Sequence, residues 1–447
     1  MPPRKGLAIS LLAFLFPLYW IVPLFGQYDP VSVTSLYLGC VSLIAMGLVQ
    51  LMATRLPVLE ELFGSLDRQY LLHKWLGICA VLAFLLHDML EPEFAGLGPE
   101  TGLSDFGAEL GEIAYYGLCG LVLASLLMLI PYHIWRWSHK FTGLLFALSA
   151  LHFVLVLKPV DLSDPLSLYV LFFCVVGILS YLYTLLPWHL FRQGFDYRIS
   201  SLERAGGALS VWLEPLGNKL SGRPGQFAFV RFDGSVPTGP HPFSFSSAPD
   251  EGGRIRFTIR NLGDDTALMH RVLKEGDRAR ISPAFGRFQT DRKSCREIWI
   301  AAGVGVTPFL AMARAYRGEK KVDLFHTVRD GKDAIHFDEL KAVAARYPDF
   351  SVHLVESRGG ERLSVSQIIR ETHVNIRQLS VLFCGPSAMR REFQRDFVKS
   401  GLPGRRFRYD HFELRSDIGL SKTVRWLLSG CARVVRNLSG ARGRSTG

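Results

Sequence analysis

The chain has 447 residues, a hydrophobic fraction of 49% and a formal net charge of +11 at pH 7, so it is too long for one ordinary domain. Its basic residues are spread along short loops of the first half, segments of the second half and the C-terminal tail, which argues against a nucleic-acid partner as the source of the charge. The seven cysteines form no CxxC pair, which excludes a disulfide framework, a zinc site and an iron–sulfur cluster.

Residues 1–190 contain six apolar runs, each long enough to cross the ~30 Å hydrocarbon core of a lipid membrane as a helix. They are 8–26, 35–53, 70–90, 112–130, 139–158 and 167–187. The first run follows Arg4 and Lys5 but is not followed by a small-residue cleavage site, so we expect a retained span and not a signal peptide.

The charges of the short loops predict the orientation, because basic residues favour the cytoplasmic side. With the N-terminus inside, eight basic residues share that side: Arg4, Lys5, Arg55, Arg68, Lys74, Arg136, Lys140 and Arg192. The opposite loop, 91–112, carries six acidic residues and no Lys or Arg. We expect a bacterial inner-membrane protein whose N-terminus and residues beyond 190 are cytoplasmic.

Four histidines lie in the third and fifth spans, His73 and His87 in one and His139 and His152 in the other. An imidazole in hydrocarbon is costly unless it is paired, ligated or lines a functional path. Fourteen residues turn an ideal helix by ~1400° and raise it ~21 Å, so His73 and His87 share a face at two depths. Thirteen residues leave His139 and His152 roughly 140° apart, so the fifth span needs local overwinding or a kink.

This pattern predicts two haems stacked across the membrane, with His73 and His139 at the inner haem and His87 and His152 at the outer one. Any single histidine is equally explained by a buried hydrogen bond. A proton relay also uses intramembrane histidines, but it does not require two similar spacings on two helices.

The remaining residues predict a soluble half with two parts. Between 195 and 288, short alternating strands such as 208–213, 226–231 and 254–260 are separated by turn residues, as in a small antiparallel barrel. From 296 onward, the apolar runs 297–302, 321–328, 351–356 and 380–384 alternate with helical segments, as in a parallel sheet. We place the boundary near Asp291.

The first of these parallel strands ends in Ala-Gly-Val-Gly-Val-Thr-Pro-Phe, residues 302–309. Glycines at a strand-to-helix turn let backbone amides approach a pyrophosphate, whose charge the helix N-terminus also favours. The segment is a shortened dinucleotide fingerprint. A tight turn without a ligand is the alternative interpretation.

Three further segments occur in a characteristic order: His-Pro-Phe-Ser-Phe-Ser-Ser-Ala-Pro at 241–249, Ile-Arg-Asn-Leu-Gly-Asp-Asp-Thr at 259–266 and Cys-Gly-Pro at 384–386. Their order and spacing resemble those of ferredoxin-reductase-type flavoproteins. Together with the four histidines, residues 35 to 415 resemble the NADPH oxidase and ferric reductase superfamily.

The resemblance implies a multidomain membrane protein. A six-helix transmembrane di-haem bundle would occupy 1–190, an antiparallel β-barrel FAD domain 191–291 and an α/β parallel-sheet NAD(P)-binding domain 292–415. Residues 416–447 would form either a short basic amphipathic helix on the inner membrane face or a disordered tail.

The resemblance also implies roles for single residues at the flavin. Phe243 would stack on the flavin ring and Ser244 would hydrogen-bond near its N5, with His241 and Pro242 close by. Arg260 and the turn from Gly263 to Thr266 would hold the FAD pyrophosphate through charge and backbone donors.

At the nicotinamide nucleotide, the resemblance assigns binding to Gly303, Gly305, Thr307 and Pro308, with Cys384 and Gly385 beside the nicotinamide. Phe243, Ser244 and Cys384 are therefore the catalytic candidates. Arg329 stands where relatives place an Arg that pairs with a 2′-phosphate, which favours NADPH over NADH.

The sequence departs from the family pattern at three places. Residues 282–286, Ser-Pro-Ala-Phe-Gly, replace a Gly-Pro-aromatic-Gly run, and the chain continues past Phe412, where animal oxidases end at an aromatic residue on the flavin. An Arg that those oxidases carry near the outer haem has no counterpart in 31–38, which weakens the case for dioxygen as acceptor.

We therefore expect an enzyme that transfers electrons from NAD(P)H through FAD and two b-type haems to an acceptor on the outer face. Ferric iron or its chelates and dioxygen, which would give superoxide, are both compatible acceptors; a quinone or a periplasmic redox protein is a third. The alternatives are a cytosolic flavin reductase on a membrane anchor and a redox-sensing proton channel or transporter. The sequence does not indicate an oligomeric state.

Overall fold

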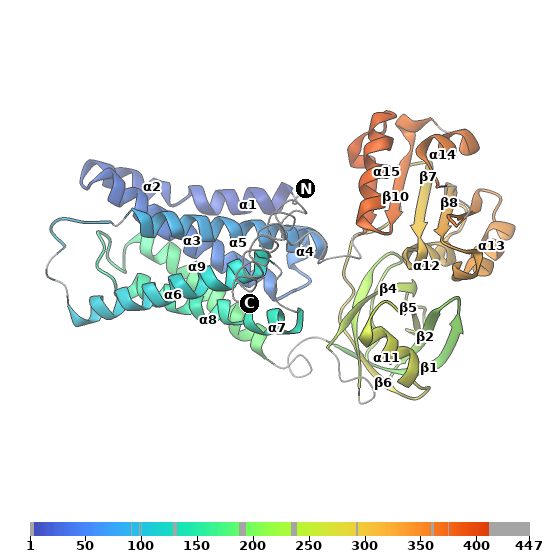
Figure 1. Ribbon diagram of the computed structural model, residues 1–447, viewed down its shortest axis with the longest axis horizontal. Helices are drawn as coiled ribbons and strands as arrows, with labels where there is room; N and C mark the ends of the chain where they lie inside the picture. The colour runs from blue at the N-terminus through green and yellow to red at the C-terminus, as the bar shows by residue number, and fades with distance from the viewer. Residues whose placement is uncertain are drawn as a thin grey trace, which may run out of the picture. The chain divides into compact units, whose positions relative to one another are not determined.

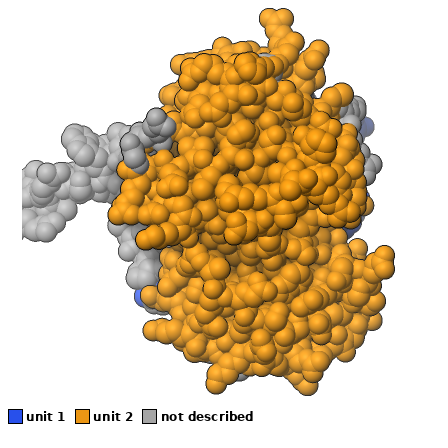
Figure 2. All heavy atoms as spheres, turned by 90° about the vertical axis from the view of Figure 1, so that its right-hand side faces the viewer, with its two compact units in different colours: residues 1–64, 68–186, 414–447 blue, residues 65–67, 187–413 orange. Residues whose placement is uncertain are grey.

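The computed structural model describes residues 4–90, 92–97, 99, 101–127, 132–186, 194–233, 239–291, 294–358, 362–373 and 375–410. The chain divides into two compact units (Figure 2). Unit 1 comprises residues 1–64, 68–186 and 414–447, and unit 2 comprises residues 65–67 and 187–413. The predicted C-terminal helix and Phe412 lie outside the described residues.

Unit 1 is helical (Figure 1). Its elements are α1 (Arg4–Leu15), α2 (Leu18–Ile21), η1 (Val22–Gly26), α3 (Pro30–Ala53), α4 (Leu59–Phe63), α5 (Leu66–Met89), α6 (Gly102–Leu127), α7 (Tyr132–Ser138), α8 (Phe141–Leu155) and α9 (Pro165–Leu185). Six described segments are long and apolar enough to cross a membrane: Lys5–Gly26, Pro30–Ala53, Leu66–Met89, Gly102–Ser125, Ile134–Leu155 and Pro165–Leu185. The six predicted spans are confirmed as helical segments, and the protein is an integral membrane protein.

The first span is interrupted, which the sequence analysis did not predict. Helix α1 ends at Leu15, and Pro17 precedes the short α2 and the 3-10 turn η1, which contains Pro23. Proline lacks the backbone N–H of a continuous helix and its ring clashes with the preceding turn. The chain therefore crosses this region as three short pieces.

Glycines allow the helices of unit 1 to approach closely. A Cβ atom at Gly47 of α3 would lie 2.5 Å from the carbonyl oxygen of Phe173 on α9, and one at Gly177 would lie 2.8 Å from the Cα of Gly47. On α6, a Cβ atom at Gly107 would lie 2.8 Å from the Cβ of Leu155 on α8. Small residues at such crossings let the backbones pack against each other in an apolar environment.

Unit 2 begins with a closed antiparallel barrel of strand order β1-β2-β5-β4-β3-β6. The strands are β1 (Phe195–Ala205), β2 (Ala208–Pro215), β3 (Phe227–Phe232), β4 (His241–Ser247), β5 (Ile255–Arg260) and β6 (Arg278–Ile281), and helix α11 (Asp264–Val272) follows β5. Alternate side chains fill the barrel, including Phe245, Phe257 and Ile259, none of which is exposed. The predicted barrel is confirmed.

The second part of unit 2 is a parallel sheet of order β11-β10-β7-β8-β9. Its strands are β7 (Arg296–Ala302), β8 (Lys321–Val328), β9 (Phe350–Glu356), β10 (Ser380–Cys384) and β11 (Phe407–Asp410). The helices are α12 (Thr307–Ala315), α13 (Phe337–Arg346), α14 (Val365–Thr372) and α15 (Ser387–Lys399). The four predicted strands are confirmed, and β11 is an additional edge strand.

The sheet is covered on both faces. Phe309 of α12 and Leu340 of α13 pack with Trp299 of β7, whereas Phe393 and Phe397 of α15 pack with the opposite face. After β7 the chain adds β8 and β9 along one edge of β7, and it then adds β10 and β11 along the other edge. This change of direction between β7 and β10 creates the crevice at the carboxyl ends of the strands where doubly wound sheets bind ligands.

A buried ionic cluster joins the barrel to the parallel-sheet part. Arg256 of β5 has a side chain that is 2% exposed, and it donates to both carboxylate oxygens of Glu339 on α13, at 2.9 and 3.0 Å. Glu339 also accepts hydrogen bonds from Arg314 of α12 at 2.7 Å and from Nδ1 of His336 at 2.7 Å. The Glu339 carboxylate thus neutralises a guanidinium that has little contact with water.

The pKa of Glu339 reflects this environment. Burial acts to raise the pKa of the carboxyl, but hydrogen bonds from His336 and Arg256 and the charge of Arg256 outweigh it and hold the pKa well below its ordinary value. The carboxylate therefore stays charged throughout the physiological range.

We predict that Glu339→Gln lowers the free energy of unfolding of unit 2 by about 3 kcal/mol, because it leaves the buried Arg256 charge without its partner. For a unit of this size, the first thermal transition should fall by roughly 6–12 °C. Asp338→Asn is the matched control, because this neighbouring carboxylate is 98% exposed and its loss should change stability by less than about 0.5 kcal/mol. Thermal unfolding of the purified protein measures both effects.

The loss of stability in Glu339→Gln should depend on pH. Since the folded pKa of Glu339 lies below the ordinary 4.5, its stabilisation is complete above that pH and is lost as the pH falls toward the folded pKa. The difference in melting temperature between the two proteins should stay constant from about pH 7 to 5 and shrink below about pH 4.5. A difference that does not depend on pH would contradict the ionic explanation.

Candidate cofactor sites

The four intramembrane histidines come from two stretches of unit 1. His73 and His87 lie on α5, His152 lies on α8, and His139 lies in the turn between α7 and α8. The ring centroids of His73 and His139 are 6.4 Å apart. A metal–imidazole bond is about 2.0 Å long, so two rings that bind one metal from opposite sides have centroids roughly 6 Å apart. The His73–His139 pair therefore has the separation of two ligands of one metal.

The spacing of His139 and His152 predicted local overwinding or a kink, and the structure has an overwound turn between α7 and α8 at residues 139–140. At the turn after α7, the amide N–H groups of Lys140, Thr142 and Gly143 bond to the carbonyls three residues earlier, at 3.1, 3.2 and 3.3 Å. Such 3-10 bonds wind the chain by ~120° per residue instead of ~100°. The extra rotation reduces the angle between His139 and His152.

Helix α3 holds both histidines of α5. Nδ1 of His73 donates to the carbonyl of Val49 at 3.1 Å, and Nδ1 of His87 donates to the carbonyl of Ser35 at 2.9 Å. These two carbonyls are fourteen residues apart, like the histidines that they hold. Because both helices repeat the same spacing, each histidine finds a backbone acceptor at its own depth.

Helix α6 plays the same part for the other two histidines. Nδ1 of His152 donates to the carbonyl of Gly107 at 2.9 Å, and Nδ1 of His139 lies 3.5 Å from the hydroxyl of Ser125. A Cβ atom at Gly111 would lie 2.5 Å from Nδ1 of His152, and one at Gly39 of α3 would lie 3.3 Å from the ring of His87. The sequence analysis missed these supporting residues, because no pattern in α3 or α6 marks a backbone acceptor.

These contacts fit haem ligation. An Nδ1 that donates to a carbonyl fixes the tautomer and leaves the lone pair of Nε2 for a metal. Within the described residues, no group of three or more His, Cys, Asp and Glu side chains is arranged to hold a metal ion by itself. The His73–His139 pair is therefore a candidate pair of ligands for a haem iron, whose remaining ligands the porphyrin would supply.

In unit 2, β4 carries the predicted flavin residues. The hydroxyl-bearing Ser244 is buried, Phe243 is half-buried and Pro242 is exposed. The ring of Phe243 stacks on that of His241, with centroids 6.2 Å apart, and Nε2 of His241 lies 3.3 Å from the carboxylate of Asp265. The structure thus brings His241, Phe243 and the start of α11 together.

The turn from Gly263 to Thr266 is a helix start. The hydroxyl of Thr266 accepts hydrogen bonds from the amides of Leu262 and Gly263 at 3.0 and 3.1 Å. The first turn of α11 also carries Asp264 and Asp265. Two amides of this turn are therefore already satisfied, and the cation closest in sequence is Arg260 at the end of β5.

Arg260 lies against the glycine turn that follows β7. Gly303 adopts φ +55°, a left-handed conformation that glycine tolerates best, and a Cβ atom there would lie 2.8 Å from Nη1 of Arg260. The same guanidinium lies 3.9 Å from the carboxylate of Asp333. The end of β5, with Arg260, and the turn after β7, with Gly303, therefore lie side by side in one site.

The residues at the carboxyl edge of β7 and β10 are packed backbone to backbone. A Cβ atom at Gly305 would collide with the carbonyl oxygen of Cys384, and one at Gly385 would lie 2.6 Å from the Cβ of Ala302. Thr307 and Pro308 are buried at the start of α12. The structure thus brings Gly303, Gly305, Thr307, Pro308, Cys384 and Gly385 together at the switch between β7 and β10.

The Cys384 side chain is fully buried. Burial, with the charge of Asp410 as a second cause, raises the pKa of its thiol well above the ordinary value. The residue therefore contributes a neutral thiol and not a thiolate nucleophile.

His326 is a site residue that the sequence analysis missed. It is fully buried in β8, and its Nε2 donates to the carbonyl of Gly303 at 3.2 Å. Burial lowers the pKa of His326 to about 4, so the imidazole is neutral at physiological pH. A histidine inside an apolar parallel strand was the available signal, because it has to bond to something local.

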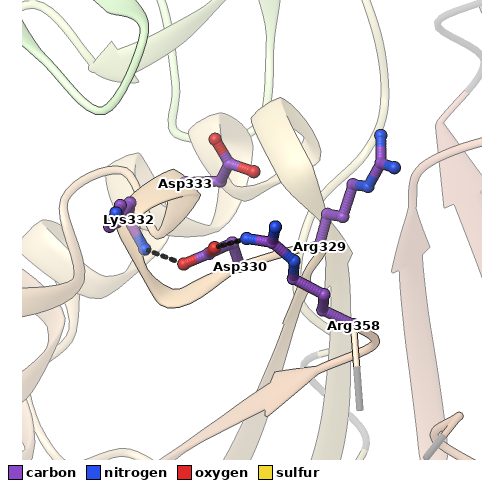
Figure 3. A pocket seen from close by; sticks show the side chains of 5 residues that line it. All are labelled: Arg329, Asp330, Lys332, Asp333 and Arg358. Atoms are coloured by element: carbon purple, nitrogen blue, oxygen red, sulfur yellow. Dashed lines mark hydrogen bonds and ion pairs between the residues drawn. The ribbon is translucent and has the colours of Figure 1, made fainter. Parts of the chain in front are cut away.

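A pocket of about 320 Å³ opens beyond the end of β8, lined by Arg329, Asp330, Lys332, Asp333 and Arg358 (Figure 3). Asp330 pairs with Arg358 at 2.5 Å and accepts from the amide of Lys332 at 3.2 Å. In the described part of the chain, the guanidinium of Arg329 has no ion-pair partner, and Figure 3 shows it extending away from the Asp330–Arg358 pair. Arg358 is an additional basic residue that the sequence analysis did not identify.

Comparisons with known proteins agree with this division. Residues 38–150 match the family model described as ferric reductase like transmembrane component, and residues 299–395 match the oxidoreductase NAD-binding domain. The chain is 28% identical over 233 residues to the toluate 1,2-dioxygenase electron transfer component of Pseudomonas putida, covering 49% of this chain and 68% of that protein. It is 31% identical over 175 residues to NADH oxidoreductase HCR of Escherichia coli K12, covering 37% of this chain and 52% of that protein.

Among solved structures, the flavohemoglobin of Malassezia yamatoensis aligns with a TM-score of 0.48 and 18% identity, covering 85% of this chain and 97% of that one. The Amycolatopsis cytochrome P450 reductase GcoB aligns with a TM-score of 0.43 and 20% identity, covering 49% of this chain and 70% of that one.

The chain spans from about half to two thirds of the length of the first curated relatives that it matches, with 68%, 47% and 59% of three of them covered. Its barrel and parallel sheet have the arrangement of ferredoxin-reductase-type oxidoreductases. The chain thus joins, in one polypeptide, a segment that matches the ferric reductase like transmembrane component and a segment that matches the oxidoreductase NAD-binding domain.

Proposed function

We propose that the protein transfers electrons from NADPH, through FAD and two b-type haems, across a bacterial inner membrane to an acceptor on the outer face. FAD would supply the change from two-electron to one-electron chemistry, and the haems would carry single electrons. The observation that carries the proposal is the arrangement of the four histidines. Each has its Nδ1 facing an acceptor on α3 or α6, at 3.1, 2.9, 3.5 and 2.9 Å for residues 73, 87, 139 and 152.

The histidines would act as two ligand pairs at two depths. His73 and His139 would hold the haem nearer the cytoplasm, and His87 and His152 the haem nearer the outside, in the orientation that the basic loops predict. The fourteen-residue step from His73 to His87 separates the two levels by ~21 Å along α5. The same spacing on α3 supports both levels from the backbone.

The crevice between β7 and β10 would bind the nicotinamide nucleotide. The turn of Gly303 and Gly305 and the start of α12 at Thr307 and Pro308 would receive the pyrophosphate on backbone amides. His326 would keep the Gly303 carbonyl turned away from that phosphate through its hydrogen bond of 3.2 Å. Cys384 and Gly385 would lie beside the nicotinamide, where a small neutral side chain leaves room for the ring.

The flavin would lie on β4, with Phe243 against its ring and Ser244 as a hydrogen-bond donor near N5. His241 and Pro242 would border it. Arg260 would bind the FAD pyrophosphate through its positive charge. Because its guanidinium also lies beside the Gly303 turn, it would stand between the flavin site and the nicotinamide nucleotide site. The Gly263–Thr266 turn would add backbone donors, against the opposing charge of Asp264 and Asp265.

Ligation by two histidines would leave no open position on either metal, so the acceptor would be reduced by outer-sphere transfer at the outer haem edge. Helix α6 begins at Gly102, ten residues earlier than the predicted span at 112. Ferric iron or a ferric chelate is our first choice, because the exposed Glu93 in the loop before α6 and the exposed Asp105, Glu109 and Glu112 in the first turns of α6 attract cations. Dioxygen is the second.

The first experiment reduces the purified, detergent-solubilised protein anaerobically with NADPH and follows the b-haem absorbance. We expect the haem bands to shift to their reduced form and then to reoxidise faster with a ferric chelate than with air. Faster reoxidation by air with superoxide formation would make the protein an oxidase. Absent haem bands would contradict the proposal, and dye reduction with permanently oxidised haems would indicate a flavin reductase on a membrane anchor.

Ligand substitutions should separate the two haems. His73→Ala and His87→Ala should each lower the haem content from two to one per chain, as measured by pyridine haemochrome absorbance and protein concentration. After His73→Ala the remaining haem should no longer be reduced by NADPH, whereas after His87→Ala it should be reduced but fail to pass electrons to the acceptor. His373→Asn, at an exposed position in unit 2, should keep both haems; equal losses in all three variants would refute the assignment.

Arg329→Ala should raise the KM for NADPH about tenfold to a hundredfold and leave that for NADH unchanged, because a hydrogen bond between charged groups contributes about 1.5–3 kcal/mol. Steady-state reduction of a dye with both nucleotides measures the ratio. Arg370→Ala, on the exposed face of α14, is the control for the loss of one positive charge. A KM that rises equally for NADPH and NADH would show that Arg329 does not recognise the 2′-phosphate.

A further inference from the structure

His139 is held differently from the other three intramembrane histidines. Nδ1 of His73, His87 and His152 each donates to a backbone carbonyl at 3.1, 2.9 and 2.9 Å. Nδ1 of His87 also lies 2.8 Å from the hydroxyl of Ser35, in addition to the Ser35 carbonyl. Nδ1 of His139 instead faces the side-chain hydroxyl of Ser125 on α6, at 3.5 Å. One ligand of the inner pair therefore depends on a side chain for its support.

The bonds of Ser125 determine what that hydroxyl can offer. Its Oγ donates to the carbonyl of Leu121 at 2.8 Å and accepts from the indole N–H of Trp135 at 2.9 Å. A serine hydroxyl has one hydrogen and two lone pairs. With the hydrogen used and one lone pair occupied, Ser125 can only accept from His139, which requires the proton on Nδ1 and leaves Nε2 for the metal.

Trp135 also contacts the imidazole directly. The two rings are stacked, with centroids 5.1 Å apart and planes 23° apart. Trp135 lies one helical turn before His139, whose amide bonds to its carbonyl at 2.8 Å. The indole thus limits the rotation of the imidazole plane while its N–H orients the hydroxyl.

We propose that Ser125 and Trp135 form a clamp that sets the tautomer and the ring plane of His139 and thereby tunes the inner haem independently of the outer one. Both are positioning residues that act through His139, and the proposal rests on the proposed function. A hydrogen-bond acceptor at Nδ1 makes a ligating imidazole more basic, which favours the oxidised metal. Removing the hydroxyl should therefore raise the midpoint potential of the inner haem.

The test compares Ser125→Ala and Trp135→Phe with the wild-type full chain by redox titration of the haem spectra and by low-temperature EPR. The haem that is missing after His73→Ala identifies the inner signal. For Ser125→Ala we expect the midpoint potential of the inner haem to rise by up to about 59 mV, which for one electron is a tenfold change in the ratio of oxidised to reduced haem. The midpoint potential of the outer haem should not change. For Trp135→Phe we expect altered EPR g-values of the inner haem alone, because the N–H is lost and a smaller ring remains.

Two substitutions serve as matched controls. Ser149→Ala removes a hydroxyl of α8 that bonds to the carbonyl four residues earlier at 3.0 Å, as that of Ser125 does. Trp137→Phe changes an exposed indole of α7. Both should leave both haems unchanged.

The outcomes distinguish this proposal from the proposed function. Wild-type protein without haem would refute the proposed function, whereas wild-type haem signals with Ser125→Ala indistinguishable from Ser149→Ala would overturn only the clamp. Equal shifts of both haems would also overturn it. If Ser125→Ala loses the inner haem, Ser125→Thr decides: recovery of the wild-type potential supports the hydroxyl, and continued loss shows that residue 125 only fills space.

Discussion

The arrangement of unit 1 depends on how an apolar bundle accommodates polar rings. An imidazole in hydrocarbon needs a partner for its N–H, and backbone carbonyls in a helix are normally already occupied. In this protein, carbonyls of α3 and α6 each accept an additional hydrogen bond from a histidine on the neighbouring helix. Because carbonyl oxygens have two lone pairs, this support does not require breaking either helix.

Close helix packing makes these bonds possible. Gly39 and Gly111 lie against the rings of His87 and His152, and a larger residue at either position would occupy the space of the imidazole. The glycines that bring α3 toward α9 and α6 toward α8 serve the same purpose, because they set the distance between backbones. In unit 2, the close contact of Gly305 with Cys384 similarly places two strand ends at one crevice.

The sequence predicted the number of spans, the barrel and the parallel sheet, because hydropathy and strand alternation are properties of contiguous segments. Histidine spacing also predicted one depth for His73 and His139, whose rings lie 6.4 Å apart. The sequence did not predict the break at Pro17, the Val49 and Ser35 carbonyls or the Ser125–Trp135 contact. Backbone acceptors have no residue signature, and which helix faces a histidine depends on packing. Likewise, the Arg256–Glu339 bond joins positions 83 residues apart, and neither residue stands out in its own segment.

The matched spacing on α3 and α5 also restricts changes in chain length. One residue inserted between His73 and His87 would rotate the second ring by ~100° and shift it by ~1.5 Å relative to the first, so it would lose its carbonyl on α3. Only an insertion of equal length between Ser35 and Val49 on α3 could restore both hydrogen bonds. The lengths of the segments between Ser35 and Val49 and between His73 and His87 therefore depend on each other. Deletions or insertions should be tolerated in the loops of unit 1 but not within either of these two segments.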